Sequence, residues 1–300
     1  MRNVKYENPP IEEGINYSQE HPLKEFAQLL LGIGILIALV LLVLNFFAGA
    51  LAKRIPFEYE QAMLSSVDIK QIFEDEELSE AGDYSTQENY LQAIADKLIP
   101  AMGLPEGMAV QVHYSASDTV NAFATLGGNM LFFKGLIDAM DSEDELAAVM
   151  GHEIAHIKLR HPIVALGKGL TIATLAASIS GSSGSSAGNL LLGSSAQLSM
   201  LKFSREQEAA ADAESALALA QVYGHIGGAD LLFQHFSEIE GEQKTKPAVM
   251  EMFRSHPYSE DRWQNLQQLA LHNGWSTSGS LQKLAFPEHQ PTKYPPKEHD

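Results

Sequence analysis

SEDELAAVMGHEIAHIKLRHP, residues 142–162, is the most informative stretch of the chain. It opens with Ser142 and Glu145 in a Ser-x-x-Glu capping box, which predicts a helix that begins near Glu143. Apolar residues then recur at helical spacing, and Pro162 is predicted to stop the helix. The sequence therefore predicts one helix that carries two histidines and a glutamate, HEIAH, in an apolar setting.

The HExxH pattern of His152, Glu153 and His156 has the spacing of a metal site. Two histidines four residues apart share one face of a helix, so both imidazoles can reach a single Zn²⁺ about 2 Å away. Glu153 points beside the metal, where it can take a proton from water that the metal activates. The alternative is two ordinary helix histidines without a metal. A catalytic zinc site also needs a third protein ligand.

His161 is the nearest further histidine, but its spacing is wrong for that third ligand. It follows His152 by nine positions, and Pro162 stands where the extended metzincin pattern requires a histidine. A histidine at the end of a helix can instead donate to the free carbonyls there. We therefore expect His161 to cap the helix C-terminus.

A better third ligand lies in residues 204–212, SREQEAAAD, which open with a second capping box. Glu208 and Asp212 are four residues apart and share a helix face. Glu208 can bind the metal, and Asp212 can accept a hydrogen bond from a ligating histidine. The alternative is an ordinary acidic first turn favoured by the helix dipole. That alternative explains Glu206 well and Asp212 less well.

HExxH followed downstream by SRxxExxxD resembles the HtpX-like and CAAX-prenyl-endopeptidase-type zinc metallopeptidases. Asn121 to Ala124, NAFA, resembles the edge strand beside the active-site cleft of that family. His256-Pro257 with Arg262 resembles its late His-Pro and arginine pair. The resemblance covers roughly residues 60–275, and its paired metal motifs are the specific part.

The resemblance implies a role for each matching residue. One Zn²⁺ per chain would be held by His152, His156 and Glu208. Asp212 would accept a hydrogen bond from a ligating histidine, and Glu153 would be the catalytic base. His256 and Arg262 would approach the substrate carbonyl and the developing oxyanion. The alternative is that they are only a His-Pro turn and a surface charge. The substrate would be held as an added strand by Asn121, Ala122, Phe123 and Ala124.

Residues 26–52 contain no charged residue and are long enough to span a bilayer as a tilted helix. Ala48-Gly49-Ala50 imitates a signal-peptide cleavage site, but a polar tail precedes the apolar run and the run is too long. We therefore expect an uncleaved single-pass anchor, with the bilayer as a partner, in a bacterial inner membrane. Cations are balanced on both flanks, so the positive-inside rule does not assign a side.

The composition argues against several kinds of binding partner and against cysteine chemistry. A net charge of −18 argues against nucleic acid as a partner and against electrostatic docking on anionic lipid. The chain has no cysteine, which rules out disulfides and thiolate metal ligands.

We expect a mostly α fold with a small β-sheet (α+β), a zincin-like metallopeptidase domain behind one N-terminal transmembrane helix. The predicted organisation is a tail at 1–25, the anchor at 26–52, an acidic connector at 53–85, the metallopeptidase domain at 86–275 and a disordered tail at 276–300. Within the domain we predict a helix at 86–99 ended by Pro100, a strand at 110–114 and a hairpin at 120–133 around Gly127-Gly128. The apolar segments 163–180 and 190–203 are predicted to form a helical hairpin rather than two further spans.

The sequence thus predicts a membrane-anchored zinc endopeptidase that acts on unfolded or extended protein and peptide substrates, with membrane protein quality control as a role. Two alternatives stay open. One is a non-catalytic membrane-tethered module that binds proteins with the same fold. The other is a latent protease in which His225 or His256 occupies the open metal position.

Overall fold

A computed structural model describes residues 22–65, 83–169, 202–242, 256–257 and 259–288. The chain divides into two compact units, residues 1–46 and 47–300. Helix α1, Pro22–Ala52, runs through the predicted anchor. Its window Pro22–Val43 is long and apolar enough to cross a membrane, and it is the one helix in the described ranges that passes this test.

The second unit is mostly helical and contains a small mixed sheet, as the sequence predicted. Strand β3, Asn129–Phe133, lies in the middle of the sheet. Strand β1, Gln111–Ser115, pairs with it in parallel, and β2, Ala122–Ala124, pairs with it antiparallel. The predicted hairpin is confirmed, because the short helix η1, Leu126–Gly128, joins β2 to β3.

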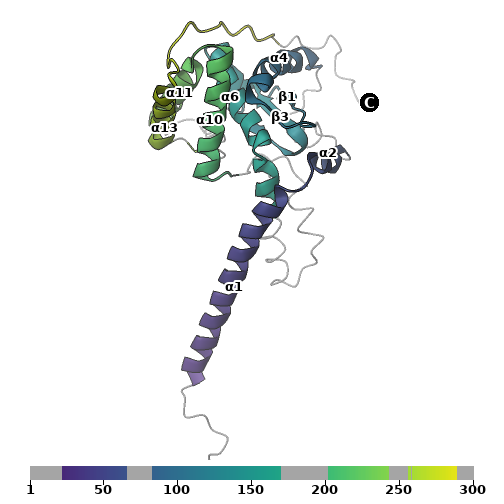
Figure 1. The fold of residues 1–300 in the computed structure, drawn as a ribbon, viewed down its shortest axis with the longest axis vertical. Helices are drawn as coiled ribbons and strands as arrows, with labels where there is room; N and C mark the ends of the chain where they lie inside the picture. The colour runs from purple at the N-terminus through teal and green to yellow at the C-terminus, as the bar shows by residue number, and fades with distance from the viewer. Residues whose placement is uncertain (1–21, 66–82, 170–201, 243–255, 258, 289–300) are drawn as a thin grey trace, which may run out of the picture. The chain divides into compact units, whose positions relative to one another are not determined.

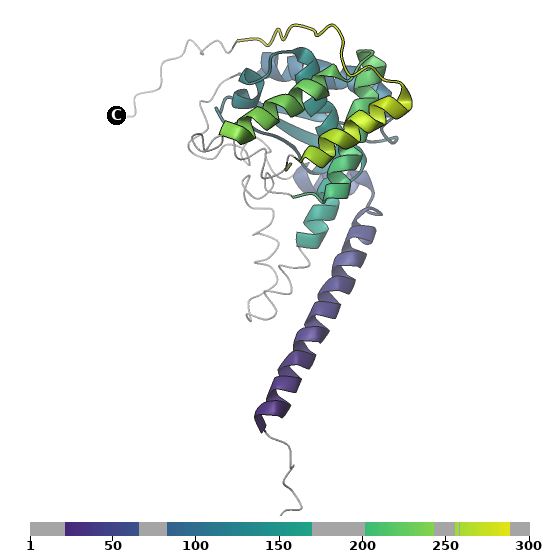
Figure 2. The same cartoon turned by 90° about the vertical axis from the view of Figure 1, so that its left-hand side faces the viewer.

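Helix α6, Glu143–Lys158, is the centre of this unit. Further helices that the structure describes include α2 Phe57–Ser65, α4 Ser85–Met102, α5 Lys134–Asp138, α10 Arg205–Val222, α11 Gly227–Glu242 and α13 Glu260–Asn273. Figures 1 and 2 show α6 and α10 side by side, with α4 and the sheet on one side and α11 and α13 on the other. Leu146, Met150 and Ile154 of α6 are fully buried in the resulting core.

Both predicted capping boxes are present. The Ser142 hydroxyl accepts a hydrogen bond from the Glu145 N–H at 3.2 Å, and the Glu145 carboxylate accepts one from the Ser142 N–H at 3.1 Å. Ser204 and Gln207 exchange the same pair of bonds at the start of α10. These contacts satisfy N–H groups that a helix start leaves without partners, so local sequence sets where both metal-site helices begin.

Two predicted helix ends are wrong. Helix α6 ends at Lys158, and after Arg160, whose φ is 61°, residues 161–169 are helical again. Pro162 therefore lies in a first helical turn, where its missing N–H costs nothing. Helix α4 passes through Pro100 to Met102 and ends at Gly103 in the left-handed conformation.

Folded contacts extend beyond residue 275, where the sequence predicted a disordered tail. The Gln282 N–H donates to Asp144 Oδ2 at 2.7 Å, and Lys283 forms a β-bridge with Ser142. Gln87 Nε2 donates to the carbonyl of Pro287 at 3.3 Å. Residues 276–288 therefore bind the start of α6 and the α4 region.

Several sequence predictions fall outside the described residues. These are residues 1–21 of the predicted N-terminal tail, 66–82 of the predicted connector and 289–300 of the predicted C-terminal tail. Residues 170–201, which hold most of both apolar segments, also lie outside.

Candidate metal centre

His152 and His156 of α6 face Glu208 of α10 in a buried cluster. The two Nε2 atoms are 3.0 Å apart, and the Glu208 carboxylate oxygens lie 3.4 Å from His152 Nε2 and 3.6 Å from His156 Nε2. Two nitrogens bound to one tetrahedral ion at 2.0–2.1 Å would lie roughly 3.3 Å apart. Two imidazoles and a carboxylate at these separations therefore fit a single metal ion.

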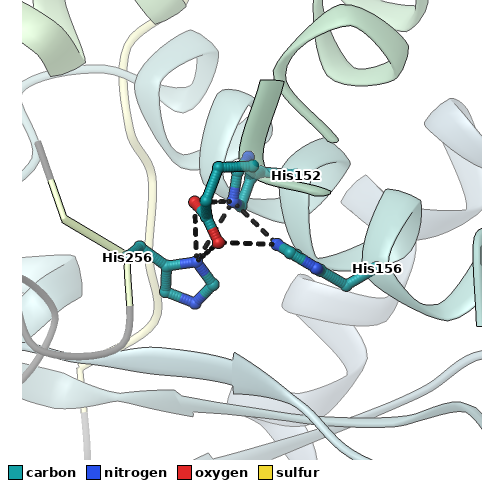
Figure 3. Close-up of side chains that lie close together, drawn as sticks. His152, His156 and His256 are labelled. Atoms are coloured by element: carbon teal, nitrogen blue, oxygen red, sulfur yellow. Dashed lines mark hydrogen bonds and ion pairs between the residues drawn. The ribbon is translucent and has the colours of Figure 1, made fainter. Parts of the chain in front are cut away.

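His256 joins this cluster from the loop before α13. Figure 3 shows its imidazole turned toward those of His152 and His156. Its Nδ1 lies 3.1 Å from Glu208 Oε1 and 3.2 Å from His152 Nε2. One ligand atom from each of these four buried residues lies within 4.8 Å of all the others. The structure thus offers a fourth metal ligand beyond the three that the sequence identified.

His225, the other histidine considered for the open metal position, is elsewhere. It is buried beside the start of α6, where its Nε2 lies 3.6 Å from Asp144 Oδ1 and its Nδ1 accepts the Gly227 N–H at 3.1 Å. Of the two histidines, only His256 reaches the cluster.

Glu153 lies between the cluster and the sheet. It is fully buried, and its Oε2 accepts a hydrogen bond from the Ala124 N–H of edge strand β2 at 2.7 Å. Its Oε1 has no hydrogen-bond partner among the described residues and lies 3.4 Å from His256 Nε2. Burial raises the pKa of Glu153. One oxygen is therefore held by the strand while the other remains available for proton transfer.

The predicted substrate residues lie next to Glu153, because the Ala124 N–H donates to that carboxylate. Ala122, Phe123 and Ala124 are the edge strand β2, and they are buried in the described structure. Asn121, just before the strand, is buried, and its Oδ1 has no hydrogen-bond partner among the described residues.

Asp212 contacts the ring nitrogen of His152 that faces away from the cluster, and Arg262 contacts Asp212 in turn. Asp212 Oδ1 is 3.0 Å from His152 Nδ1, and Arg262 donates two hydrogen bonds to the Asp212 carboxylate. Arg262 Nη1 also lies 3.0 Å from Glu208 Oε2. Burial alone would raise the pKa of Asp212, but its bonds to Arg262 and His152 hold that pKa below its usual value.

The two helix histidines have opposite electrostatic surroundings. Burial lowers the pKa of His152, but the nearby Asp212 and Glu208 outweigh this effect and raise the pKa to about 10. Burial and the neighbouring His152 lower the pKa of His156 well below its ordinary value. His156 is therefore the ligand that is already neutral, as metal binding requires.

Two residues beside His156 were missed or misplaced by sequence reasoning. Among the described residues the His161 side chain contacts His156, with the two Nδ1 atoms 2.9 Å apart, and not the helix carbonyls that were predicted. Phe203 stacks on His156 with ring centroids 4.1 Å apart and planes 24° apart. Phe203 immediately precedes the N-cap Ser204, a position where apolar residues often fix the entry to a helix, and this was the available signal.

Two histidines on α6, a glutamate on α10 and a buried glutamate beside them define the site of an HExxH-type metallopeptidase. The family model of Peptidase family M48 matches residues 85–270, and the chain belongs to this family. The resemblance that the motifs indicated is thus confirmed.

Curated relatives carry related names. The chain is 34% identical over 158 residues to metalloprotease LoiP of Escherichia coli K12, covering 51% of this chain and 60% of LoiP. It is 26% identical over 200 residues to mitochondrial metalloendopeptidase OMA1 of Schizosaccharomyces pombe, covering 64% and 57%. It is 27% identical over 219 residues to metalloprotease YcaL of E. coli K12, covering 70% and 82%. The chain therefore spans about three fifths of LoiP and OMA1.

Proposed function

We propose that this protein is a membrane-anchored zinc endopeptidase that hydrolyses peptide bonds in unfolded or extended proteins. The observation that carries the proposal is the convergence of His152, His156 and Glu208 beside a buried glutamate. Nitrogen and carboxylate ligands in this number suit Zn²⁺, and we expect one ion per chain.

Bound zinc would supply an activated water and polarise the scissile carbonyl. Residues of the chain would transfer the proton of the attacking water. Glu153 accepts it from the attacking water and delivers it to the leaving amine, while the Ala124 N–H holds the other carboxylate oxygen in place. The raised pKa of Glu153 suits a group that must both take and return a proton.

The substrate would bind along β2. Within the described ranges this strand pairs with β3 alone, and we infer that its other edge accepts an extended peptide as an added strand. Because Ala124 of the same strand contacts Glu153, a peptide bound there would run past the proton-transfer group. Main-chain pairing of this kind selects extended chains over folded ones.

The anchor helix suggests where the substrates are. The apolar window Pro22–Val43 would hold the enzyme in a bacterial inner membrane as a single-pass protein. Unfolded or misassembled membrane proteins are substrates that such an enzyme can reach, so we assign it to membrane protein quality control. Nucleic acid is not proposed as a partner, because the net charge is −18.

One observation favours a second candidate, a latent form of the same protease. His256 Nδ1 lies close enough to Glu208 and His152 to act as a fourth ligand. A fourth protein ligand would take the position that a catalytic site leaves for water. In an active form His256 would turn away from that position and leave it to water.

The test combines metal analysis of the purified protein with casein cleavage by wild type and Glu153→Gln. The proposal expects one zinc per chain in both proteins and cleavage by wild type alone. A latent enzyme would retain zinc, cleave slowly and be activated by His256→Ala. Zinc without cleavage in the wild type and in His256→Ala would indicate a non-catalytic protein-binding module.

A further inference from the structure

We propose that His161 is a positioning residue for the metal centre, which accepts a hydrogen bond from His156 and thereby fixes which ring nitrogen of His156 faces the metal. The inference rests on the proposed metal site and adds a residue that the HExxH and glutamate motifs do not contain. Four observations support it: a nitrogen–nitrogen contact, its burial, an unusual backbone turn and a stacked aromatic ring.

The contact between the two histidines defines a single proton position. The Nδ1 atoms of His156 and His161 are 2.9 Å apart, a hydrogen-bond distance that needs one proton between them. Nε2 of His156 faces His152 and Glu208, so metal binding requires its lone pair to be free. The proton must then be on Nδ1 of His156, and His161 must accept it.

The two helix ligands thus have different supports. Nδ1 of His152 is held by a carboxylate, that of Asp212, at 3.0 Å. Nδ1 of His156 is held by a neutral imidazole. Ligating histidines usually donate their second N–H to an acceptor, and that acceptor fixes the ring orientation. For His156 Nδ1 this acceptor, among the described residues, is Nδ1 of the buried His161.

The backbone explains how His161 reaches a residue only five positions earlier. Arg160 has a φ of 61°, which a non-glycine residue rarely adopts, and it interrupts the helix between Lys158 and His161. Arg160 Nε donates to buried Glu60 at 2.7 Å, and its Nη2 donates to the carbonyl of Ile55 at 2.7 Å. A strained turn held by such contacts is typical of positions that orient a functional group.

Phe203 completes the support of His156. Its ring stacks on the face of the His156 imidazole with centroids 4.1 Å apart, and its centroid is 5.8 Å from that of His161. The imidazole is therefore restrained on one face by Phe203 and at one edge by His161. Rotation of the ring away from the metal would break both contacts.

Two substitutions separate hydrogen bonding from packing. In His161→Asn the side-chain Oδ1 can take the place of Nδ1 as an acceptor, whereas His161→Leu fills much of the space without an acceptor. We would measure Zn²⁺ affinity of the full-length protein in detergent by competition with a chromogenic chelator. The exposed histidine of α13, in His272→Leu, is the matched control.

We expect His161→Leu to bind zinc about 10–100-fold more weakly, with His161→Asn and the control close to wild type. Equal loss in the asparagine and leucine variants, or no loss in either, would overturn the proposal. Should His161→Leu unfold, the ¹⁵N chemical shifts of His156 in the zinc-loaded wild type show which ring nitrogen carries the proton. A proton on Nδ1 supports the proposal, and a proton on Nε2 overturns it. Zinc binding without proteolysis would refute the proposed activity alone, while a wild type that binds no zinc would refute both.

Discussion

Arg262 holds both carboxylate oxygens of Asp212, with Nε–Oδ2 and Nη2–Oδ1 distances of 2.8 Å each. This paired geometry gives strong charge-assisted hydrogen bonds. The third guanidinium nitrogen, Nη1, is 3.0 Å from Glu208. In the structure Arg262 therefore contacts the two carboxylates that face His152, and the oxyanion contact that the family resemblance implied stays a prediction.

We expect Arg262→Ala to destabilise the fold. The Arg262 side chain is 11% exposed and that of Asp212 is 9% exposed, so removing the arginine leaves a buried carboxylate without its main partner. Breaking a buried pair in this way costs roughly 3–5 kcal/mol. Denaturant unfolding of the metal-free protein measures the loss. Lys134→Ala is the control, because its two ion pairs are exposed and should contribute less than about 1 kcal/mol. Equal small losses in both variants would contradict the prediction.

Glu153→Gln should retain zinc and stability but lose nearly all proteolysis. The amide oxygen can still accept the Ala124 N–H, so the side chain stays in place, but the amide cannot act as a base. Metal analysis and casein cleavage on the same preparation provide the measurement. Substantial cleavage by the zinc-loaded variant would rule out Glu153 as the base.

Each of His152→Ala, His156→Ala and Glu208→Ala should remove the zinc, because three protein ligands are the minimum for such a site. Asp212→Asn should weaken zinc binding by about 10–100-fold, since it supports His152 without touching the metal. Equilibrium dialysis against zinc gives all four values. Glu206→Ala is the control on the exposed face of α10. Zinc loss there with full zinc in Glu208→Ala would reverse the ligand assignment.

Structural features that depend only on nearby residues were predictable from the sequence. Both capping boxes, the hairpin at Gly127-Gly128 and the helical face shared by Glu208 and Asp212 depend on residues a few positions apart. The pairing of Asp212 with His152 followed from the general chemistry of ligating histidines. Such short-range rules identify the helices of the site and the residues on them.

Features that depend on distant residues were not predictable. The end of α6 is set by Arg160, whose turn is held by Glu60 and Ile55, far earlier in the chain. His161 therefore looked like a helix cap. Residues 276–288 looked like a polar tail because their partners, such as Asp144, lie in another part of the sequence. Pro100 lies inside α4, where packing of Leu98 and Met102 in the core favours one more turn.

The last prediction concerns alkaline pH and the segment that follows α13. Tyr114 of β1 is buried beneath Phe286, with ring centroids 5.5 Å apart, and beside Tyr84 at 5.3 Å. Burial raises the pKa of Tyr114 from 10.0 to about 12, although the charge of Lys134 partly opposes the shift. The folded state therefore keeps this proton at pH values where the unfolded chain has lost it.

Because the native state binds more protons than the unfolded state above pH 10.0, stability should fall as pH rises from there to about 12. Tyr114→Phe should remove this part of the decline in denaturant unfolding measured across the same range. Phe286→Ala should uncover the ring and lower the pKa of Tyr114 toward its ordinary value. The difference in tyrosinate absorbance with and without Tyr114→Phe reports that pKa directly. An ordinary value in the wild type, unchanged by Phe286→Ala, would mean that residues 276–288 do not cover β1 in solution.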